Sequence, residues 1–97
     1  MQLSEFQRLI ERIYYERDKA RGVGGTFMWF AEEVGELATE LRSGKDKAKL
    51  ADEFADVLAW LSTLASVSGV ELADAARKYA DGCPACKNAP CTCSEKA

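Results

Sequence analysis

The sequence contains no histidine among its 97 residues, and this absence limits the chemistry available to the chain. Histidine is the commonest general base, and it activates the nucleophile in many serine and cysteine hydrolases. Those arrangements are therefore excluded. Any catalysis must use carboxylates, a metal ion, lysine, tyrosine or a thiolate.

The chain also lacks long apolar runs and an excess of basic charge. No apolar run approaches the ~20 residues that span a bilayer, and the start, Met1 to Glu5, lacks the basic and apolar parts of a signal peptide. The formal charge of −3 offers no basic face of the kind that nucleic-acid binding requires. We therefore expect a cytoplasmic protein that binds neither nucleic acid nor a membrane.

Apolar residues recur at intervals of three and four, and no strand-like alternation is present. This spacing predicts four helices, at residues 3 to about 20, 26–43, 46–68 and 71–80. Short connections at the last two breaks imply antiparallel neighbours. The predicted fold class is all-α, a four-helix bundle over residues 1–81, with residues 82–97 as a cysteine-rich C-terminal appendage.

Two acidic signatures stand on the two central predicted helices. Glu32-Glu33-x-x-Glu36 lies on the second helix and Glu53-x-x-Asp56 on the third. A spacing of three or four residues places carboxylates about 5–6 Å apart on one face of a helix. Two antiparallel helices could direct four of them at one point. Mg²⁺ prefers such oxygen ligands and commonly bridges carboxylates and phosphates, so the pattern predicts a magnesium site and a phosphate ester or anhydride as substrate.

The acidic signatures and their surroundings resemble a known family. The segment Phe27 to Leu37, followed by Asp52 to Trp60, resembles the MazG-like nucleotide pyrophosphohydrolases of the all-α NTP pyrophosphohydrolase superfamily, whose signature is EExxE, a spacer, then ExxD. The resemblance covers roughly residues 3 to 80. It implies that Mg²⁺, or Mn²⁺ in its place, is held by Glu33, Glu36, Glu53 and Asp56. It also implies catalytic roles for Glu32, Glu33 and Glu53, with Glu32 as a further ligand or a base that orients water.

The resemblance further implies an activity and an assembly. Family members hydrolyse nucleoside triphosphates to a monophosphate and pyrophosphate, and they assemble as homodimers or dimers of dimers. A phosphoribosyl-ATP pyrophosphohydrolase or a pyrimidine-specific relative is the alternative within the superfamily. A non-catalytic nucleotide-sensing or adaptor module and a metal-buffering protein are alternatives from other classes. The sequence does not specify the base, the sugar or the number of subunits.

Four residues are candidates for binding the substrate: Trp29, Trp60, Lys78 and Arg21. The tryptophans could stack on a base, although in a small bundle tryptophan also packs in a core or an interface. Lys78 lies where the family places a phosphate-contacting basic residue, but Asp81 and Gly82 stand where relatives often have asparagine. Arg21 precedes the glycine stretch between the first two helices. Solvent-exposed positions remain the alternative for both basic side chains.

The C-terminal segment contains all four cysteines and both prolines. Its pattern is Cys83-x₂-Cys86-x₄-Cys91-x-Cys93, and the leading Cys-Pro-x-Cys resembles a zinc knuckle. Four thiolates suit a structural Zn²⁺. Reduced or oxidised thiols and an iron–sulfur or redox role are the alternatives, and disulfides are unusual in a cytoplasmic protein. The segment would serve as a cap, an oligomer contact or a docking element.

Overall fold

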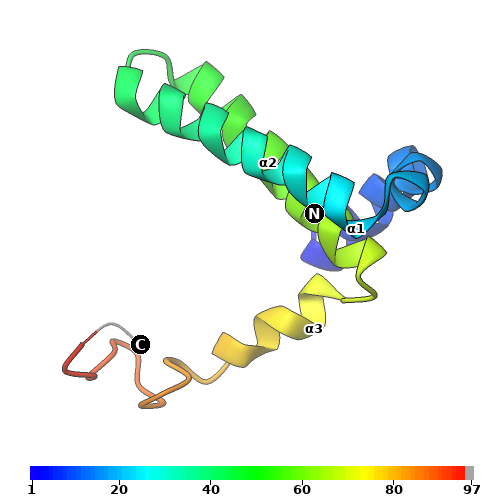
Figure 1. The fold of residues 1–97 in the computed structure, drawn as a ribbon. Helices are drawn as coiled ribbons and strands as arrows, with labels where there is room; N and C mark the ends of the chain where they lie inside the picture. Colours follow the sequence, from blue (N-terminus) through cyan, green and yellow to red (C-terminus); the bar gives the residue numbers. More distant parts are fainter. Residues whose placement is uncertain (96–97) are drawn as a thin grey trace.

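The computed structural model describes residues 1–95, and within them it contains helices and no strand (Figure 1). The helices are α1 (Leu3–Ser43), α2 (Lys47–Val67), α3 (Leu72–Ala76) and the short 3₁₀ helix η1 (Arg77–Tyr79). The predicted all-α class is confirmed. The helix expected at 46–68 corresponds closely to α2, whereas the first two predicted helices are the two halves of α1.

Helix α1 is bent at a single residue. Gly22 has φ 82° and ψ 176°, a combination far outside the helical region that is accessible essentially to glycine alone. Gly24 and Gly25 continue the helix, so the break predicted across residues 21–25 is confined to Gly22. The N-terminal half of α1 consequently turns away from the direction of its C-terminal half (Figure 1).

The C-terminal half of α1 and helix α2 form an antiparallel pair joined by a tight connection. Gly44 adopts the left-handed conformation, with φ 61°, and its N–H donates to the carbonyl oxygen of Glu40 at 3.0 Å. Asp46 then caps α2, because its carboxylate accepts hydrogen bonds from the backbone N–H groups of Ala48 and Lys49. This connection sets the two acidic signatures side by side.

A buried glutamine fastens the N-terminal half of α1 to the end of α2. The Gln7 side chain is fully buried, and its amide nitrogen donates to the hydroxyl of Ser66 at 3.1 Å and to the carbonyl oxygen of Val70 at 2.9 Å. Its amide oxygen accepts from the N–H of Leu72 at 2.8 Å. Gln7 therefore satisfies backbone groups at the α2–α3 turn that would otherwise lack partners.

The C-terminal arm, which we define as residues 72–95, leaves the α1–α2 pair (Figure 1). Helix α3 contacts α1, and η1 contacts α3. The helix expected over residues 71–80 is thus shorter than predicted and tightens into η1 after Ala76. Its alanine-rich sequence offers little apolar surface for packing, and Tyr79 is 63% exposed. The predicted four-helix bundle is not confirmed, since α3 contacts α1 but the arm then leads away from the pair (Figure 1).

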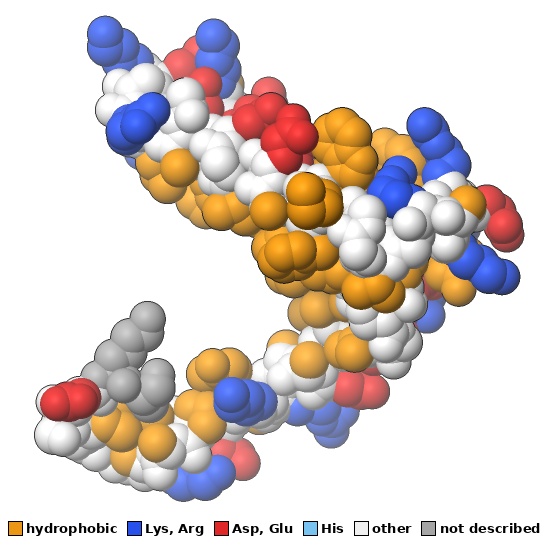
Figure 2. All heavy atoms as spheres, viewed as in Figure 1, with side chains coloured by type: hydrophobic (Ala, Val, Ile, Leu, Met, Phe, Trp, Pro, Cys, Tyr) orange, Lys and Arg blue, Asp and Glu red, His pale blue; other side chains and the backbone are white. Residues whose placement is uncertain are grey.

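Much of the apolar surface of the single chain is uncovered. The only buried hydrophobic residues in the described part are Ile10 and Ala65, whereas Phe27, Phe54 and Leu58 are each at least 40% exposed. Figure 2 shows a band of hydrophobic side chains along the α1–α2 pair. Within residues 1–95, no single helix could cross a membrane by length and hydropathy; only α2 taken together with α3 and η1, bent by 106°, passes that test.

Candidate functional site

Carboxylates from α1 and α2 meet on one side of the helix pair. Glu33 of α1 and Glu53 and Asp56 of α2 each place a carboxylate oxygen within 4.8 Å of the other two. Glu53 and Asp56 are one turn apart on the same face, and the antiparallel arrangement sets Glu33 opposite them. We call these three residues the acidic group. Figure 2 shows acidic side chains gathered on this part of the pair, apart from the hydrophobic band.

Within residues 1–95, the acidic group makes no ion pair that would neutralise its negative charge. One oxygen of Glu33 and one of Glu53 are buried without a hydrogen-bond partner. Loss of water contacts, followed by the charges of Glu36 and Asp56, raises the pKa of both Glu33 and Glu53. The ion pairs found in residues 1–95 involve other carboxylates. Hard oxygen donors with unused lone pairs fit a divalent cation such as Mg²⁺.

The other two acidic residues of the first signature lie at different distances from this group. Glu36 is near enough for its charge to raise the pKa of Glu33 and Glu53, although its oxygens fall outside the set that lies within 4.8 Å. Glu32 is exposed and is not among those three residues. The structure therefore sets Glu36 beside the acidic group and Glu32 in contact with solvent.

Two tryptophans, Trp29 of α1 and Trp60 of α2, form an aromatic pair. In α1, Trp29 lies between the acidic residues and Gly22. The rings of Trp29 and Trp60 are stacked, with centroids 6.1 Å apart and planes 14° from parallel. The guanidinium of Arg21 lies 5.0 Å from the centroid of the Trp60 ring, a cation–π distance. Three of the four predicted substrate-binding residues therefore lie together, with Trp29 and Arg21 each in contact with Trp60. Trp60 already packs against two neighbours, whereas Trp29 is 47% exposed.

A buried carboxylate, which sequence reasoning missed, positions the arginine of this cluster. Asp18 is 4% exposed, and it accepts hydrogen bonds from the hydroxyl of Thr63 at 3.0 Å and from the Arg21 guanidinium at 2.9 Å. In the sequence, Asp18 lies in a basic stretch and resembles a surface residue. A signal in the sequence was the pair of polar residues Ser62 and Thr63 in the largely apolar C-terminal half of α2.

A pocket of about 280 Å³ adjoins the acidic group. Asp56 belongs both to the acidic group and to the pocket wall, so the two features are continuous. Arg17 and Arg21 supply positive charge to the same pocket. The complete lining is Tyr14, Arg17, Asp18, Arg21, Asp56, Ala59, Trp60 and Thr63. Carboxylates that could hold a cation, next to a pocket lined by two arginines, suit a ligand that carries several negative charges.

Lys78 lies apart from this site. It belongs to η1 on the C-terminal arm, and its ammonium is 5.7 Å from the centroid of the Tyr79 ring. Figure 1 shows the arm far from the part of the α1–α2 pair that contains residues 33, 53 and 56. Within one chain, Lys78 therefore does not reach the acidic group.

The four cysteines form a second cluster on the C-terminal arm, where their sulfur atoms lie within 4.8 Å of one another. The N–H of Thr92 donates to the Cys86 sulfur and contributes to lowering the pKa of Cys86 to about 5. Hydrogen bonds with the other thiols, that of Cys91 first, raise the pKa of Cys93 to about 11. Without a cation, the four thiols therefore do not all ionise at neutral pH.

Comparison with known proteins identifies the family. The MazG nucleotide pyrophosphohydrolase domain matches residues 24–86, about two thirds of the 97-residue chain. No curated protein matches the sequence. The matched range contains both acidic signatures and the aromatic pair, but it excludes the buried Asp18 and the pocket arginines. On this match, with its helical architecture, the chain belongs to the MazG nucleotide pyrophosphohydrolase family.

Proposed function

We propose that this protein hydrolyses nucleoside triphosphates to nucleoside monophosphates and pyrophosphate in a Mg²⁺-dependent reaction. Family membership supports nucleotide pyrophosphohydrolase activity. The observation that carries the finer proposal is the acidic group, with its two unpaired buried oxygens, beside a pocket that holds two arginines. Carboxylates alone would repel a triphosphate, so the site requires a cation between them.

The proposed roles follow from the positions of the side chains. Glu33, Glu36, Glu53 and Asp56 would hold Mg²⁺, which when bound neutralises phosphate oxygens and lowers the pKa of water. Arg21, held by Asp18, and Arg17 would contact the phosphates from the pocket side. Preorganised cations of this kind stabilise negative charge that develops in phosphoryl transfer.

We also assign roles to Glu32 and Trp29. Glu32 is exposed on α1 and lies outside the acidic group, so we assign it to accept a proton from the attacking water. Trp29 has the more exposed ring of the aromatic pair, and we assign it to stacking on the base. Stacking tolerates every base, which leaves base preference to the pocket.

We also propose that the chain acts as a homodimer, or as a dimer of such dimers. The hydrophobic band on the α1–α2 pair lies apart from the acidic side chains, and the single chain leaves it uncovered (Figure 2). Covering this band with the same helices of a second copy would produce the four-helix arrangement that one chain lacks. Lys78 would then contact phosphate at the site of a second copy, since it does not reach its own.

The test is a product assay with ribo- and deoxynucleoside triphosphates in the presence and absence of Mg²⁺, resolving monophosphate, diphosphate, phosphate and pyrophosphate. We expect monophosphate and pyrophosphate in equal amounts, dependent on Mg²⁺. Glu53→Gln should reduce turnover by at least about 100-fold, the scale expected when a metal ligand or its support is removed. Its circular dichroism spectrum should remain helical, because Glu53 is not a core side chain.

The matched control is Asp52→Asn, which removes a neighbouring charge of α2 that is outside the acidic group. It should retain most of the activity. Release of diphosphate and phosphate would contradict the proposed position of bond cleavage. Full activity of Glu53→Gln would contradict the site, and absence of turnover on every nucleotide would favour a nucleotide-sensing module.

A further inference from the structure

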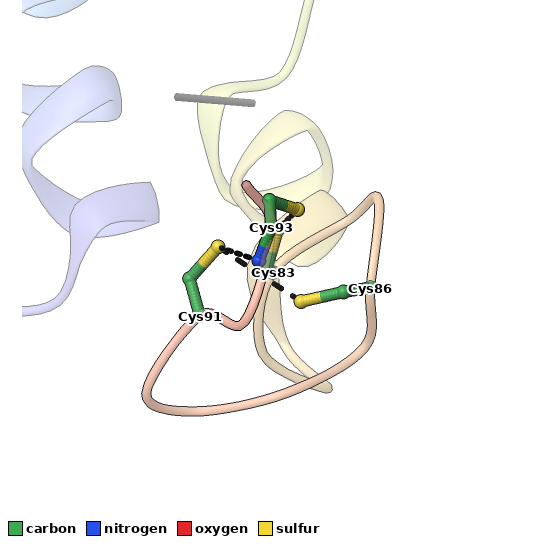
Figure 3. Close-up of side chains that lie close together, drawn as sticks. All are labelled: Cys83, Cys86, Cys91 and Cys93. Atoms are coloured by element: carbon green, nitrogen blue, oxygen red, sulfur yellow. Dashed lines mark hydrogen bonds between the residues drawn. The ribbon is translucent and has the colours of Figure 1, made fainter. Parts of the chain in front are cut away.

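The cysteine loop, residues 82–93, contains a cluster of metal-ligating side chains that the nucleotide site does not use. Most of it lies beyond the matched family domain, which ends at residue 86. Figure 3 shows the four cysteines gathered in one place, where the two limbs of the loop approach each other. All four are free thiols, and three of them are partly buried.

The spacing of the sulfur atoms matches the coordination shell of one tetrahedral ion. The Cys83 and Cys93 sulfurs are 3.8 Å apart, and those of Cys86 and Cys91 are 3.9 Å apart. Four sulfurs at ~2.3 Å from a central zinc ion are separated by about 3.8 Å along each tetrahedral edge. Disulfide bonds would require about 2.05 Å. These two separations equal a tetrahedral edge, and all four sulfurs lie within 4.8 Å of one another, so the cluster is compact enough to surround one ion.

The backbone of the loop is arranged to hold this cluster. Gly82 has φ +100°, and a Cβ there would lie 2.9 Å from the carbonyl carbon of Asn88. That close approach allows the N–H of Cys83 to donate to the Asn88 carbonyl at 2.9 Å. The side-chain amide nitrogen of Asn88 also donates to the Thr92 hydroxyl at 2.7 Å. This bond holds the segment that contains Cys91 and Cys93 against the middle of the loop.

Backbone N–H groups also point at the sulfur atoms. Thr92 donates to the Cys86 sulfur at 3.4 Å, and the N–H of Cys93 donates to the Cys91 sulfur at 3.3 Å. Such outer contacts orient metal ligands and stabilise their negative charge. The loop has no large hydrophobic side chain of its own. A segment of this size without a core usually needs a metal ion or disulfides to keep one conformation.

We propose that the cysteine loop binds one Zn²⁺ ion through all four cysteines, in a closed tetrahedral site separate from the nucleotide site. A single ion is favoured over a cluster of several irons because the four sulfurs lie within 4.8 Å of one another. With every position taken by a protein ligand, the ion has a structural role and leaves no place for substrate. It fixes the end of the arm that carries Lys78.

The test measures the metal itself, so its outcome does not depend on nucleotide turnover. Purified full-length protein, analysed by elemental mass spectrometry, should contain about one zinc ion per chain. A Cys86→Ser, Cys91→Ser variant should lose it while keeping the helical circular dichroism of α1 and α2. A Glu53→Gln, Asp56→Asn variant is the matched control for binding to carboxylates, and it should retain the zinc.

A second measurement does not depend on the serine variant. Metal-free reduced protein titrated with Co²⁺ should give the intense visible bands of tetrahedral thiolate coordination, and Zn²⁺ should abolish them at one equivalent. Stoichiometric iron, zinc retained by the serine variant, zinc lost from the carboxylate variant, or disulfides that account for all four thiols would each overturn the proposal. Inactive protein that contains zinc would contradict the nucleotide site alone.

Discussion

At the scale of single residues, the raised pKa values of Glu33 and Glu53 connect the stability of the fold with the proposed metal site. Both have pKa values raised above the ordinary 4.5, because they have lost water contacts and lie beside other carboxylates. Ionisation of these carboxylates is therefore unfavourable unless a cation is bound, as we propose for this site. Asp18 is different, since its buried charge is satisfied by Arg21 and Thr63. Glu33 and Glu53 therefore belong to the proposed metal site, whereas Asp18 has a structural role.

The raised pKa values predict how stability depends on pH. In metal-free protein the folded state holds protons more tightly than the unfolded state, so the free energy of unfolding falls as pH rises through the folded pKa of Glu33 and Glu53. The stabilising contribution is complete below the unfolded value, near 4.5, and is lost above the raised value. If Mg²⁺ binds the ionised carboxylates as proposed, it should reverse this trend.

Thermal unfolding between about pH 5 and pH 8, with EDTA and with Mg²⁺, tests this prediction. Glu53→Gln should melt at a higher temperature than the parent protein in EDTA at neutral pH, because one repelling charge is gone. It should gain less from Mg²⁺. Asp52→Asn should resemble the parent in its response to Mg²⁺. Equal stabilisation of Glu53→Gln and the parent by Mg²⁺ would contradict a cation site at the acidic group.

At the scale of secondary-structure elements, the bend of α1 depends on one glycine. Gly22 occupies a conformation with positive φ, and an added Cβ would meet no atom within 4 Å. The cost of Gly22→Ala is therefore backbone strain alone, and we expect a loss of about 1–3 kcal/mol in the free energy of unfolding. Urea denaturation followed by circular dichroism measures it.

Gly24→Ala is the matched control for the bend. Gly24 lies in the helical part of α1, and it too has open space where a Cβ would be. Alanine is a better helix former than glycine, so this variant should gain about 0.5–1 kcal/mol. Opposite signs at two glycines only two residues apart are the expected result. A neutral or stabilising Gly22→Ala would show that the bend is not needed.

The elements also show what the sequence could and could not predict. Apolar spacing located α2 to within a residue or two. The spacing of the acidic residues predicted that four carboxylates of two antiparallel helices could meet at one point, and the structure brings three of them together, Glu33, Glu53 and Asp56. Apolar spacing could not identify Gly22 as the residue that leaves the helix, because Gly24 and Gly25 have the same intrinsic freedom. Asp18 was missed because its role depends on Thr63, 45 residues away.

At the scale of the whole molecule, the α1–α2 pair has two unlike surfaces. Acidic side chains lie on one part, near the aromatic pair and the pocket, and the hydrophobic band lies apart from them (Figure 2). Apolar residues at seven-residue intervals, Phe27, Val34 and Leu41, contribute to the band from α1, and Phe54, Leu58 and Leu61 contribute from α2. An exposed apolar surface of this extent is typical of an interface between subunits.

The proposed dimer predicts the effect of a charge placed in the hydrophobic band. Leu58 is 40% exposed on α2, so glutamate can be accommodated in the single chain but would be desolvated in an interface. We expect Leu58→Glu to sediment as a monomer at concentrations where the parent protein is a dimer. Its melting temperature should fall and become independent of protein concentration, since association no longer contributes to stability. Ala48→Glu adds the same charge to exposed α2 surface roughly 80° around the helix from Leu58, and it should remain dimeric. If Leu58→Glu stays dimeric, the copies associate through another surface; if the parent is itself a monomer, the band is covered by something other than a second copy.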